Sequence, residues 1–329
     1  MKLVKIAVDL MGGDNAPASI TEGIMSAVKE NGELEIIAYG LKGSYTGDHP
    51  QIKFIEVTEK VESEDDPVRA VRKKKDSSLV RAAEAVKDGT ADACVSAGNT
   101  GAIMSAGLFV VGRLKGVERP AIASLIPNTS GKGIMLLDMG ANSDNKPKHL
   151  YQFAEMASIY MEEIEGRKNP EVGLINIGSE ENKGNEVTRA AFELLKESDL
   201  NFTGNFETRD IISGTIDIAV TDGFTGNIVL KTIEGTAKSM MMEIKDIFMK
   251  NTKNKLAASV LRNDFGRVKD LLDYREVGGA PLLGLDGYVL KAHGSSDALA
   301  IHNAVRQAVR MAESGALEKI KAKVGDNHE

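Results

Sequence analysis

The sequence is poor in the residues that build redox and metal centres. Its single cysteine, Cys94, allows no internal disulfide and no cysteine-based metal cluster. Cys94 lies in a strand-like segment, so we expect its thiol to be buried and inert. The five histidines never recur with H-x-x-x-H spacing, which argues against zinc. We predict no metal site and no cofactor, although aspartates in the loops leave a magnesium ion as the alternative.

Long apolar runs and the usual nucleotide signatures are also missing. No run approaches the about 18 apolar residues that span a bilayer, and Leu3 to Val8 meets Asp9 without the features of a signal peptide. We therefore predict a cytoplasmic protein. The absence of G-x-G-x-x-G, G-x-x-x-x-G-K-[ST] and G-x-S-x-G argues against common dinucleotide sites, P-loops and serine hydrolases.

The composition is that of a globular protein. The chain has 329 residues, 42% of them hydrophobic, enough for one large α/β domain or two ordinary ones. With 41 Lys and Arg against 48 Asp and Glu, the net charge of −7 argues against a nucleic-acid partner. Without a repeat or composition break, we predict a single domain over residues 1–329, with a helical excursion at about 236–275.

The stretch from Ile216 to Lys231 combines a buried strand, a glycine turn and a helix start. Ile216 to Val220 is the apolar run of a parallel strand, and Asp222 and Gly223 break it. We expect Thr225 or Asn227 to cap the helix that follows. A helix start offers unpaired N–H groups to an anion, but an ordinary turn between strand and helix remains the alternative.

Polar loops follow six predicted strands. In an open α/β sheet such strand ends face one crevice, where ligands bind. Small donors with one lysine, Lys183, and one histidine, His293, suit the binding of an oxyanion, although each could instead be a solvated or turn-bound side chain. The loops are Asp9 to Asp14, Ser96 to Gly101, Asp138 to Asn142, Asn176 to Glu186, Thr221 to Asn227 and His293 to Asp297.

A basic run follows Asp65, Asp66 and Pro67, where the proline suits a first helical turn. Such a run is usually a solvated helix face. The functional alternative is an anchor for phosphate or for an acidic partner protein. Its five cations are Arg69, Arg72, Lys73, Lys74 and Lys75.

Three predicted helices carry apolar side chains. We expect Leu150 to Glu163 to pack in the core, with an acyl pocket as the alternative. Met240, Met241, Met242 and Met249 should fill irregular core rather than bind lipid. Lys255 to Asp273 is basic and amphipathic, which suits a membrane surface, a partner subunit or its own domain. Its apolar face comprises Leu256, Val260, Leu261, Phe265, Val268, Leu271 and Leu272.

Eight motifs, taken together and in order, carry a resemblance to a known family. They are VDLMGGDNAP, DDPVRAVRKKKDSSLV, VSAGNTGA, LLDMGAN, INIGSEENKGNE, VTDGFTGN, GGAPLLGLDG and KAHGSSD. Along nearly the whole chain the sequence resembles the bacterial phosphate acyltransferases of the PlsX type. The resemblance implies a three-layer α/β/α sandwich with a mostly parallel sheet, similar to phosphate acetyltransferases and isocitrate dehydrogenases. Asn15 stands where that family leads us to expect histidine.

The same resemblance implies a reaction and its partners. A fatty acyl group passes from acyl carrier protein to inorganic phosphate, and the acyl phosphate serves a membrane glycerol-3-phosphate acyltransferase in phospholipid synthesis. It also implies a homodimer, and a reactive product favours a peripheral membrane contact. Phosphate is itself the nucleophile, which fits the missing catalytic triad. The alternatives are an NAD-dependent decarboxylating dehydrogenase of the isocitrate type and a non-catalytic scaffold for acyl carrier protein.

Roles are expected of individual residues. The resemblance implies catalysis by Lys183 and Asn227. The charge of the basic run leads us to expect carrier docking by the five cations from Arg69 to Lys75. Substrate and phosphate binding is expected of Asp9, Gly12, Gly13, Asp14, Gly98, Asn99, Thr100, Asn142, Thr225, His293, Ser295 and Ser296.

Overall fold

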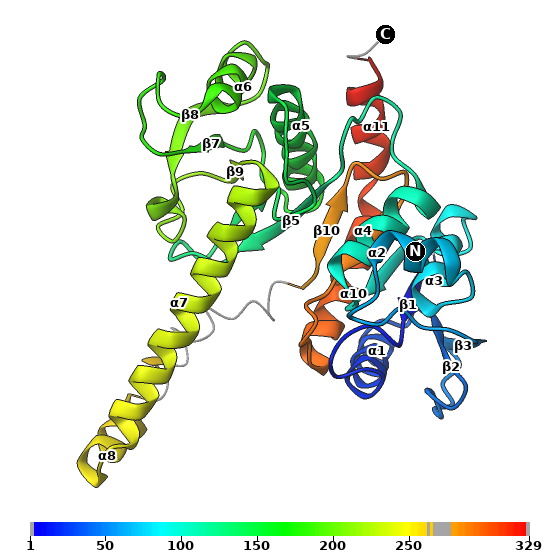
Figure 1. The fold of residues 1–329 in the computed structure, drawn as a ribbon. Helices are drawn as coiled ribbons and strands as arrows, with labels where there is room; N and C mark the ends of the chain where they lie inside the picture. Colours follow the sequence, from blue (N-terminus) through cyan, green and yellow to red (C-terminus); the bar gives the residue numbers. More distant parts are fainter. Residues whose placement is uncertain (1–2, 262–263, 266–277, 327–329) are drawn as a thin grey trace.

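One mixed sheet forms the centre of the protein. The computed structural model describes residues 3–261, 264–265 and 278–326. Over these residues, the strand order is β3-β2-β1-β4-β11-β10-β5-β6-β9-β7-β8 (Figure 1). The strands are β1 Val4–Asp9, β2 Leu34–Leu41, β3 Ile52–Val57, β4 Ala93–Ser96, β5 Ala121–Ile126, β6 Ile134–Leu137, β7 Val172–Asn176, β8 Phe202–Glu207, β9 Ile218–Val220, β10 Ala280–Leu283 and β11 Tyr288–Lys291.

The sheet reverses direction near its middle. Strands β3, β2, β1, β4 and β11 run parallel to one another, as do β6, β9, β7 and β8. Between these halves, β11 with β10, β10 with β5 and β5 with β6 are all antiparallel. Three reversals leave the two parallel halves running in opposite senses. Strands β5 and β6 form a hairpin, and the expectation of a mostly parallel sheet is confirmed.

Helices cover both faces of the sheet, which confirms the three-layer architecture. On one face a core cluster includes Ile24, Phe153, Phe192, Ile301 and Ile320; they come from α1 Ala18–Glu30, α5 Pro147–Glu163, α6 Glu186–Lys196, α10 Ala298–Ser314 and α11 Ala316–Asp326. The second cluster, on the other face, is formed with α2 Pro67–Lys73, α3 Ser78–Lys87, α4 Thr100–Ala106 and the π-helix η1 Gly107–Val111. A short 3₁₀ turn, η2 Thr208–Asp210, follows β8.

Helix α5 is a core helix, as its amphipathic pattern predicts. Leu150, Phe153 and Met161 are fully buried, so this side of the helix packs against the sheet and does not open onto an acyl pocket. Cys94 is also fully buried, and desolvation raises the pKa of its thiol far above the ordinary value. The thiolate is therefore not accessible as a nucleophile, in agreement with the prediction.

A long helical arm leaves the sheet after β9. It consists of α7 Gly223–Met249 and α8 Thr252–Val260, and it projects away from the rest of the protein (yellow in Figure 1). The prediction that its methionines fill core is wrong, because Met240, Met242 and Met249 are each more than half exposed. Only the first turns of α7 reach the body of the protein. Of the amphipathic stretch predicted from Lys255 to Asp273, residues 262–263 and 266–273 lie outside the described residues.

The glycine-rich segment from Gly278 to Gly287 contains a strand that the sequence pattern did not predict. Ala280–Leu283 forms β10, paired with both β11 and β5. Gly278, at φ 94°, and Gly284, at φ 94°, bound the strand and adopt a conformation that L-residues with a side chain avoid. Proline and glycine are typical of a loop, but here they form and flank a short connecting strand.

Candidate active site

Three of the predicted loops meet at the carboxyl ends of β1, β4 and β11. We call Asp9–Asp14, Ser96–Gly101 and His293–Asp297 the first loop group. The Ser96 hydroxyl donates to Asp9 Oδ2 at 2.7 Å, and the backbone N–H of Asp14 donates to Gly294 O at 2.8 Å. A Cβ placed on Gly12 would lie 2.6 Å from Gly98 N. Two loop backbones are thus in contact at a position that only glycine can occupy.

Asp9, buried at the end of β1, holds this loop group together through hydrogen bonds. Its carboxylate is only 3% exposed and also accepts a hydrogen bond from Met11 N at 3.0 Å. Desolvation raises the pKa of Asp9, while hydrogen bonds from Ser78, Ser96 and the backbone oppose the rise. The structure therefore gives Asp9 a role in holding the loops in place, with its oxygens directed at protein donors.

The loop after β11 presents His293 and two serines. His293 Nδ1 lies 2.9 Å from Ser295 Oγ, and Asn15 Nδ2 lies 3.2 Å from each of the Ser295 and Ser296 carbonyl oxygens, to which it donates. Asn15, the departure from the family pattern, thus binds this loop to the loop after β1. The Ser296 hydroxyl is buried and has no hydrogen-bond partner among the described residues. Burial, then the charge of Lys291, lowers the pKa of His293, so its neutral form is favoured.

Two further loops form a second loop group, Asp138–Asn142 and Thr221–Asn227, at the ends of β6 and β9. Asp138 is fully buried and accepts hydrogen bonds from the N–H groups of Ile122, Ala141 and Asn142. Burial raises the pKa of its carboxyl group against these bonds. The side-chain amide of Asn142 donates to Asp138 Oδ2 and Pro120 O, both at 2.8 Å. Both amide hydrogens of Asn142 are therefore already engaged in holding the loop.

Helix α7 begins at this second group. The prediction that Thr225 or Asn227 caps the helix is wrong, because the cap is Asp222, which accepts from Thr225 N at 2.9 Å. An aspartate just before the first helical residue is the better cap, since its side chain reaches the N–H three residues on. The Thr225 hydroxyl also donates to Asp222, at 2.8 Å. Thr225 is thereby a partner of the cap.

Asn227 lies in the second turn of the backbone after that cap. Gly226 lets α7 approach closely, because a Cβ there would lie 1.9 Å from Asp138 O. A Cβ on Gly140 would be 3.5 Å from the Cβ of Asn227, so that side chain extends over the loop after β6. Asn227 is exposed, and its amide has no hydrogen bond within the described part of the chain. Its donors are free for a substrate.

Lys183 belongs to neither of the two loop groups defined above. It lies in the exposed loop between β7 and α6, where Asn176 Nδ2 donates to Lys183 O at 3.1 Å. Its ammonium is 3.8 Å from Glu180 Oε1, and its side chain is 46% exposed. Because β7 pairs with β9 in parallel, this loop leaves the sheet on the same edge as the loop that starts α7.

The expectation of a single crevice at one sheet edge needs correction. It assumed one uniformly parallel sheet, but the reversal through β10 and β5 puts the first and second loop groups at opposite edges. Helix α7 connects them across the face of the second core cluster, against which Leu230 and Ile233 pack. Lys231 and Glu234 of α7 act electrostatically on both Lys291 and His293. The first turns of α7 therefore extend from one loop group to the other.

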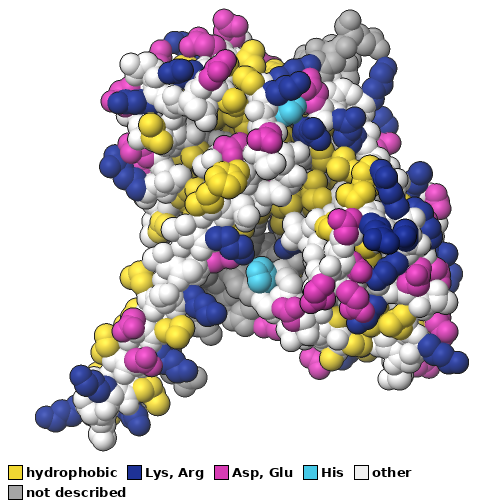
Figure 2. Space-filling model, in the orientation of Figure 1, with side chains coloured by type: hydrophobic (Ala, Val, Ile, Leu, Met, Phe, Trp, Pro, Cys, Tyr) yellow, Lys and Arg dark blue, Asp and Glu magenta, His cyan; other side chains and the backbone are white. Residues whose placement is uncertain are grey.

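The basic run forms α2 and the turn after it, as the proline predicts. Asp66 caps the helix by accepting from Arg69 N at 2.8 Å, and Pro67 is its first residue. Lys and Arg side chains gather over this part of the surface, at the right of Figure 2. Lys74 does not contribute to the exposed charge, because its ammonium binds Asp65 and Lys60 O. The exposed cations are Arg69, Arg72, Lys73 and Lys75, with Arg72 5.0 Å above the ring centre of Phe109.

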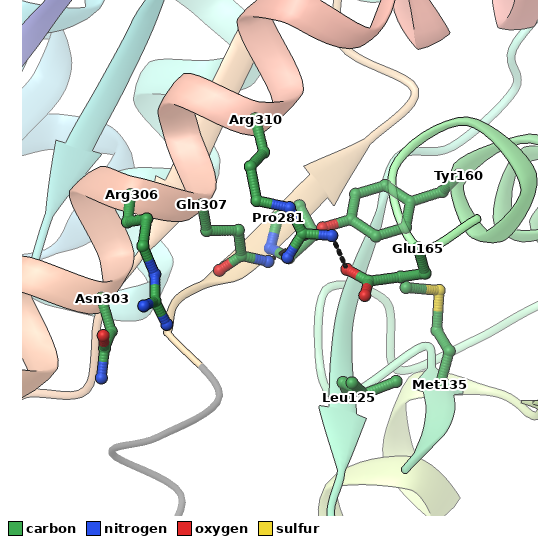
Figure 3. Close-up of a pocket in the computed structure, with 9 residues that line it drawn as sticks. All are labelled: Leu125, Met135, Tyr160, Glu165, Pro281, Asn303, Arg306, Gln307 and Arg310. Atoms are coloured by element: carbon green, nitrogen blue, oxygen red, sulfur yellow. Dashed lines mark hydrogen bonds and ion pairs between the residues drawn. The ribbon is translucent and has the colours of Figure 1, made fainter. Parts of the chain in front are cut away.

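A separate cavity between α5 and α10 contains none of the predicted site residues. Figure 3 shows Arg306, Gln307 and Arg310 of α10 on one side, with Tyr160 and Glu165 opposite. Arg310 pairs with Glu165 at 3.2 Å, and Gln307 donates to the Tyr160 hydroxyl at 2.9 Å and accepts from Gly279 N at 2.7 Å. Arg310 and Gln307 therefore use Glu165 and Tyr160 as partners, and these contacts link α10 to α5 and the residues that follow it.

Comparison with known proteins decides the family. A family model described as "Fatty acid synthesis protein" matches residues 4–319. Proteins named "Phosphate acyltransferase" from Staphylococcus aureus strains MSSA476 and Newman are each 51% identical over 328 residues, 99% of this chain and 100% of theirs. The chain belongs to this family. It is a member of the phosphate acyltransferases of fatty acid synthesis, as the resemblance in the sequence indicates.

Solved structures support the same fold at much lower identity. A branched-chain phosphotransacylase from Enterococcus faecalis V583 is 13% identical, with a TM-score of 0.61 over 94% of this chain and 99% of that one. A phosphotransacetylase from Streptococcus pyogenes is 17% identical, with a TM-score of 0.59 over 94% of each chain. The three-layer fold of this family member is thus shared with phosphotransacylases.

Proposed function

We propose that the protein transfers a fatty acyl group from acyl carrier protein to inorganic phosphate and releases acyl phosphate. The observation that carries the proposal is the 51% identity, over the full length, to relatives named phosphate acyltransferase. The geometry supports it, because the candidate site offers hydrogen-bond donors and cations. The buried thiol of Cys94 cannot act as a nucleophile, which fits a reaction in which phosphate is the nucleophile.

The reaction requires little covalent chemistry from the protein. A phosphate oxygen attacks the thioester carbonyl carbon, a C–O bond forms, and the C–S bond breaks as the thiolate leaves and takes up a proton. The protein must bring the two substrates together and stabilise the negative charge that develops on the carbonyl oxygen. The free amide of Asn227 and the exposed ammonium of Lys183 are the donors that we propose for these tasks.

Docking of the carrier is proposed for the exposed cations of α2. Acyl carrier protein is acidic, and complementary charge speeds association and fixes orientation. Arg72 and Phe109 together present a cation and an exposed aromatic ring on this surface. The predicted role of Lys74 is weakened by its ion pair with Asp65.

We further propose a cytoplasmic homodimer that contacts the membrane peripherally and passes acyl phosphate to a membrane glycerol-3-phosphate acyltransferase. The support is the apolar surface of the arm, where Met240, Met242 and Ile247 on α7 and Leu256 and Val260 on α8 are each more than half exposed (yellow along the arm in Figure 2). A surface of this kind normally meets a partner or a lipid. No helix in the described ranges is both long and apolar enough to cross a bilayer.

A direct assay tests the activity. Purified protein is incubated with acyl carrier protein bearing a fatty acyl group and with phosphate, and acyl phosphate is trapped with hydroxylamine; we expect formation that depends on all three components. NADH production from an isocitrate-type substrate would instead indicate the dehydrogenase. Binding of the carrier with no turnover of either kind would indicate a scaffold.

A further inference from the structure

Lys291 is a cation at the end of a buried strand. It is the last residue of β11 and pairs with Ser96 in the parallel register between β11 and β4. By the alternation of strand side chains, it lies on the same face of the sheet as Val289, toward the second core cluster. Its ammonium makes one long hydrogen bond, 3.4 Å to Ala292 O. No carboxylate of the described residues lies within ion-pair distance, so this charge lacks a direct counterion.

Helix α7 brings a second cation to the same place. Lys231 Nζ lies 2.7 Å from Glu234 Oε2, and these two charges are the ones that act on Lys291. Burial lowers the pKa of Lys291, the positive charge of Lys231 lowers it further, and Glu234 opposes the shift. The packing of Ile233 beside the second core cluster fixes this part of the helix. Lys231 therefore has Glu234 as an ion-pair partner, whereas the same carboxylate acts on Lys291 only at longer range.

The first loop group completes this cluster with neutral donors. His293 lies near enough to Lys291, Lys231 and Glu234 for their charges to shift its pKa. Ser296, in the same turn, has a buried hydroxyl with no partner among the residues described. Asp14 is the other carboxylate that acts on His293. A partly buried ammonium without an ion pair, beside a buried hydroxyl without a partner among the described residues, is an arrangement that binds a small anion.

We propose that Lys291 and Lys231 bind the inorganic phosphate that serves as nucleophile, with His293 and Ser296 as hydrogen-bond partners. The inference rests on the proposed acyl transfer and adds two residues to it. Lys291 opens the KAHGSSD motif but has no role assigned by the resemblance, and Lys231 lies outside the eight motifs. Asn227 and Lys231 are four residues apart and thus share a face of α7. Phosphate held by Lys231 would therefore lie one helical turn from the amide proposed to polarise the thioester carbonyl. This arrangement also gives α7 a function in joining the two loop groups.

Neutral variants of the two lysines test the proposal. Lys291→Met and Lys231→Met each remove one ammonium and retain most of the side-chain volume, and Lys238→Met, farther along the exposed part of α7, is the matched control. We expect the KM for phosphate to rise roughly 10-fold to 100-fold in the first two variants, the size expected for losing a charged hydrogen bond. The KM for the acyl carrier substrate should not change in these two variants. In the control variant the KM for phosphate should equal that of wild type. Lys231 is exposed, so its variant keeps the test decisive even if Lys291→Met fails to fold.

Titration calorimetry with inorganic phosphate alone gives a readout that does not depend on turnover. We expect wild type and Lys238→Met to bind phosphate equally and the other two variants to bind at least tenfold more weakly. Equal binding by wild type and Lys231→Met would overturn the inference while leaving acyl transfer intact. A rise in the KM for the carrier substrate alone would also overturn it, since the cations would then serve the phosphodiester of the carrier's prosthetic arm. A wild type that binds phosphate through these lysines but forms no acyl phosphate would refute the proposed function and leave the site standing.

Discussion

Two buried carboxylates illustrate how single residues shape the candidate site. Asp9 and Asp138 each lie at the end of an apolar strand and accept several hydrogen bonds, both from the loops that they begin and from neighbouring segments. Ligand binding was the expected role of Asp9, since a sequence shows the residue type but not the direction of its side chain. Their donors hold the turns, whereas burial penalises the ionised form. These residues should therefore couple protonation to stability.

The carboxyl group of Asp9 is predicted to contribute to the free energy of unfolding by an amount that decreases as pH rises, and Asp9→Asn should remove this contribution. Because folding raises the pKa of Asp9 above its ordinary value of 3.8, the folded state retains this proton longer than the unfolded state. The contribution is fully present below 3.8 and is lost as pH rises through the folded pKa. In urea unfolding at a series of pH values, the stability of wild type relative to Asp9→Asn should fall as pH rises through this window.

Asp76→Asn is the control of opposite sign. Hydrogen bonds from Thr58 lower the pKa of Asp76, so its contribution is present above 3.8 and is lost as pH falls through the folded pKa. Relative to this variant, the stability of wild type should rise with pH. Curves of the same slope for both variants would contradict the argument.

Lys183→Ala and Asn227→Ala are each predicted to lower turnover on the order of 10²-fold or more, the usual effect of losing an oxyanion-type donor. Both side chains are exposed or half-exposed and make few contacts, so the melting temperature should change little. Initial rates of acyl phosphate formation measure the effect. Lys196→Ala, which removes an exposed lysine from the helix behind the Lys183 loop, should retain wild-type activity. Near-normal rates for both site variants would refute these two assignments.

At the scale of elements, most strands and helices follow from hydrophobic periodicity. The predicted helix from Leu150 to Glu163 lies within α5, and the predicted strand from Ile216 to Val220 contains β9, because each has a clear apolar pattern. β10 was missed because four residues flanked by glycine resemble a loop until two neighbouring strands are known. Lys291 had two signals in the sequence, because it closes the apolar run Tyr288 to Leu290 and opens the KAHGSSD motif. Its neighbours on α7 could not be read from the sequence.

Charge reversal on α2 is predicted to weaken recognition of the carrier. With Arg69, Arg72, Lys73 and Lys75 all changed to Glu, the KM for the acyl carrier substrate should rise and its dependence on salt should weaken, because attraction between exposed charges is screened by ions. Turnover at saturating substrate should not change. Initial rates at several salt concentrations measure both effects. Lys29→Glu on α1, which lies on the opposite face of the sheet, is the control. An unchanged KM would leave α2 as a solvated helix face.

At the scale of the whole molecule, the arrangement of the site depends on the reversal of the sheet. Strand-to-helix rhythm predicts parallel strands, and it predicts the loops at their ends correctly. It cannot reveal that three antiparallel steps through β10 and β5 turn half of the sheet around. That information lies in contacts between segments far apart in the chain. The same limit applies to the arm, whose methionines look like core residues until the structure shows them exposed.

The arm carries the last prediction, which separates a subunit interface from a membrane contact. Leu256 and Val260 of α8 are 70% and 78% exposed. Phe265 packs edge-on against Phe248 of α7, with ring centres 4.6 Å apart, so replacing it would disturb the arm itself. Leu256→Glu combined with Val260→Glu is predicted to abolish flotation with anionic liposomes and to leave the dimer intact, because acidic side chains at the end of the arm are repelled by the lipid.

Met240→Glu combined with Met242→Glu, nearer the body of the protein on α7, is predicted to have the converse effect and dissociate the dimer, because the charges would be buried between subunits. Sedimentation velocity measures the oligomeric state of wild type and both variants beside the flotation assay. A wild type that stays free of liposomes would refute the membrane contact. If the α8 variant dissociates, the end of the arm belongs to the subunit interface. If the α7 variant remains a dimer, Met240 and Met242 do not lie in that interface.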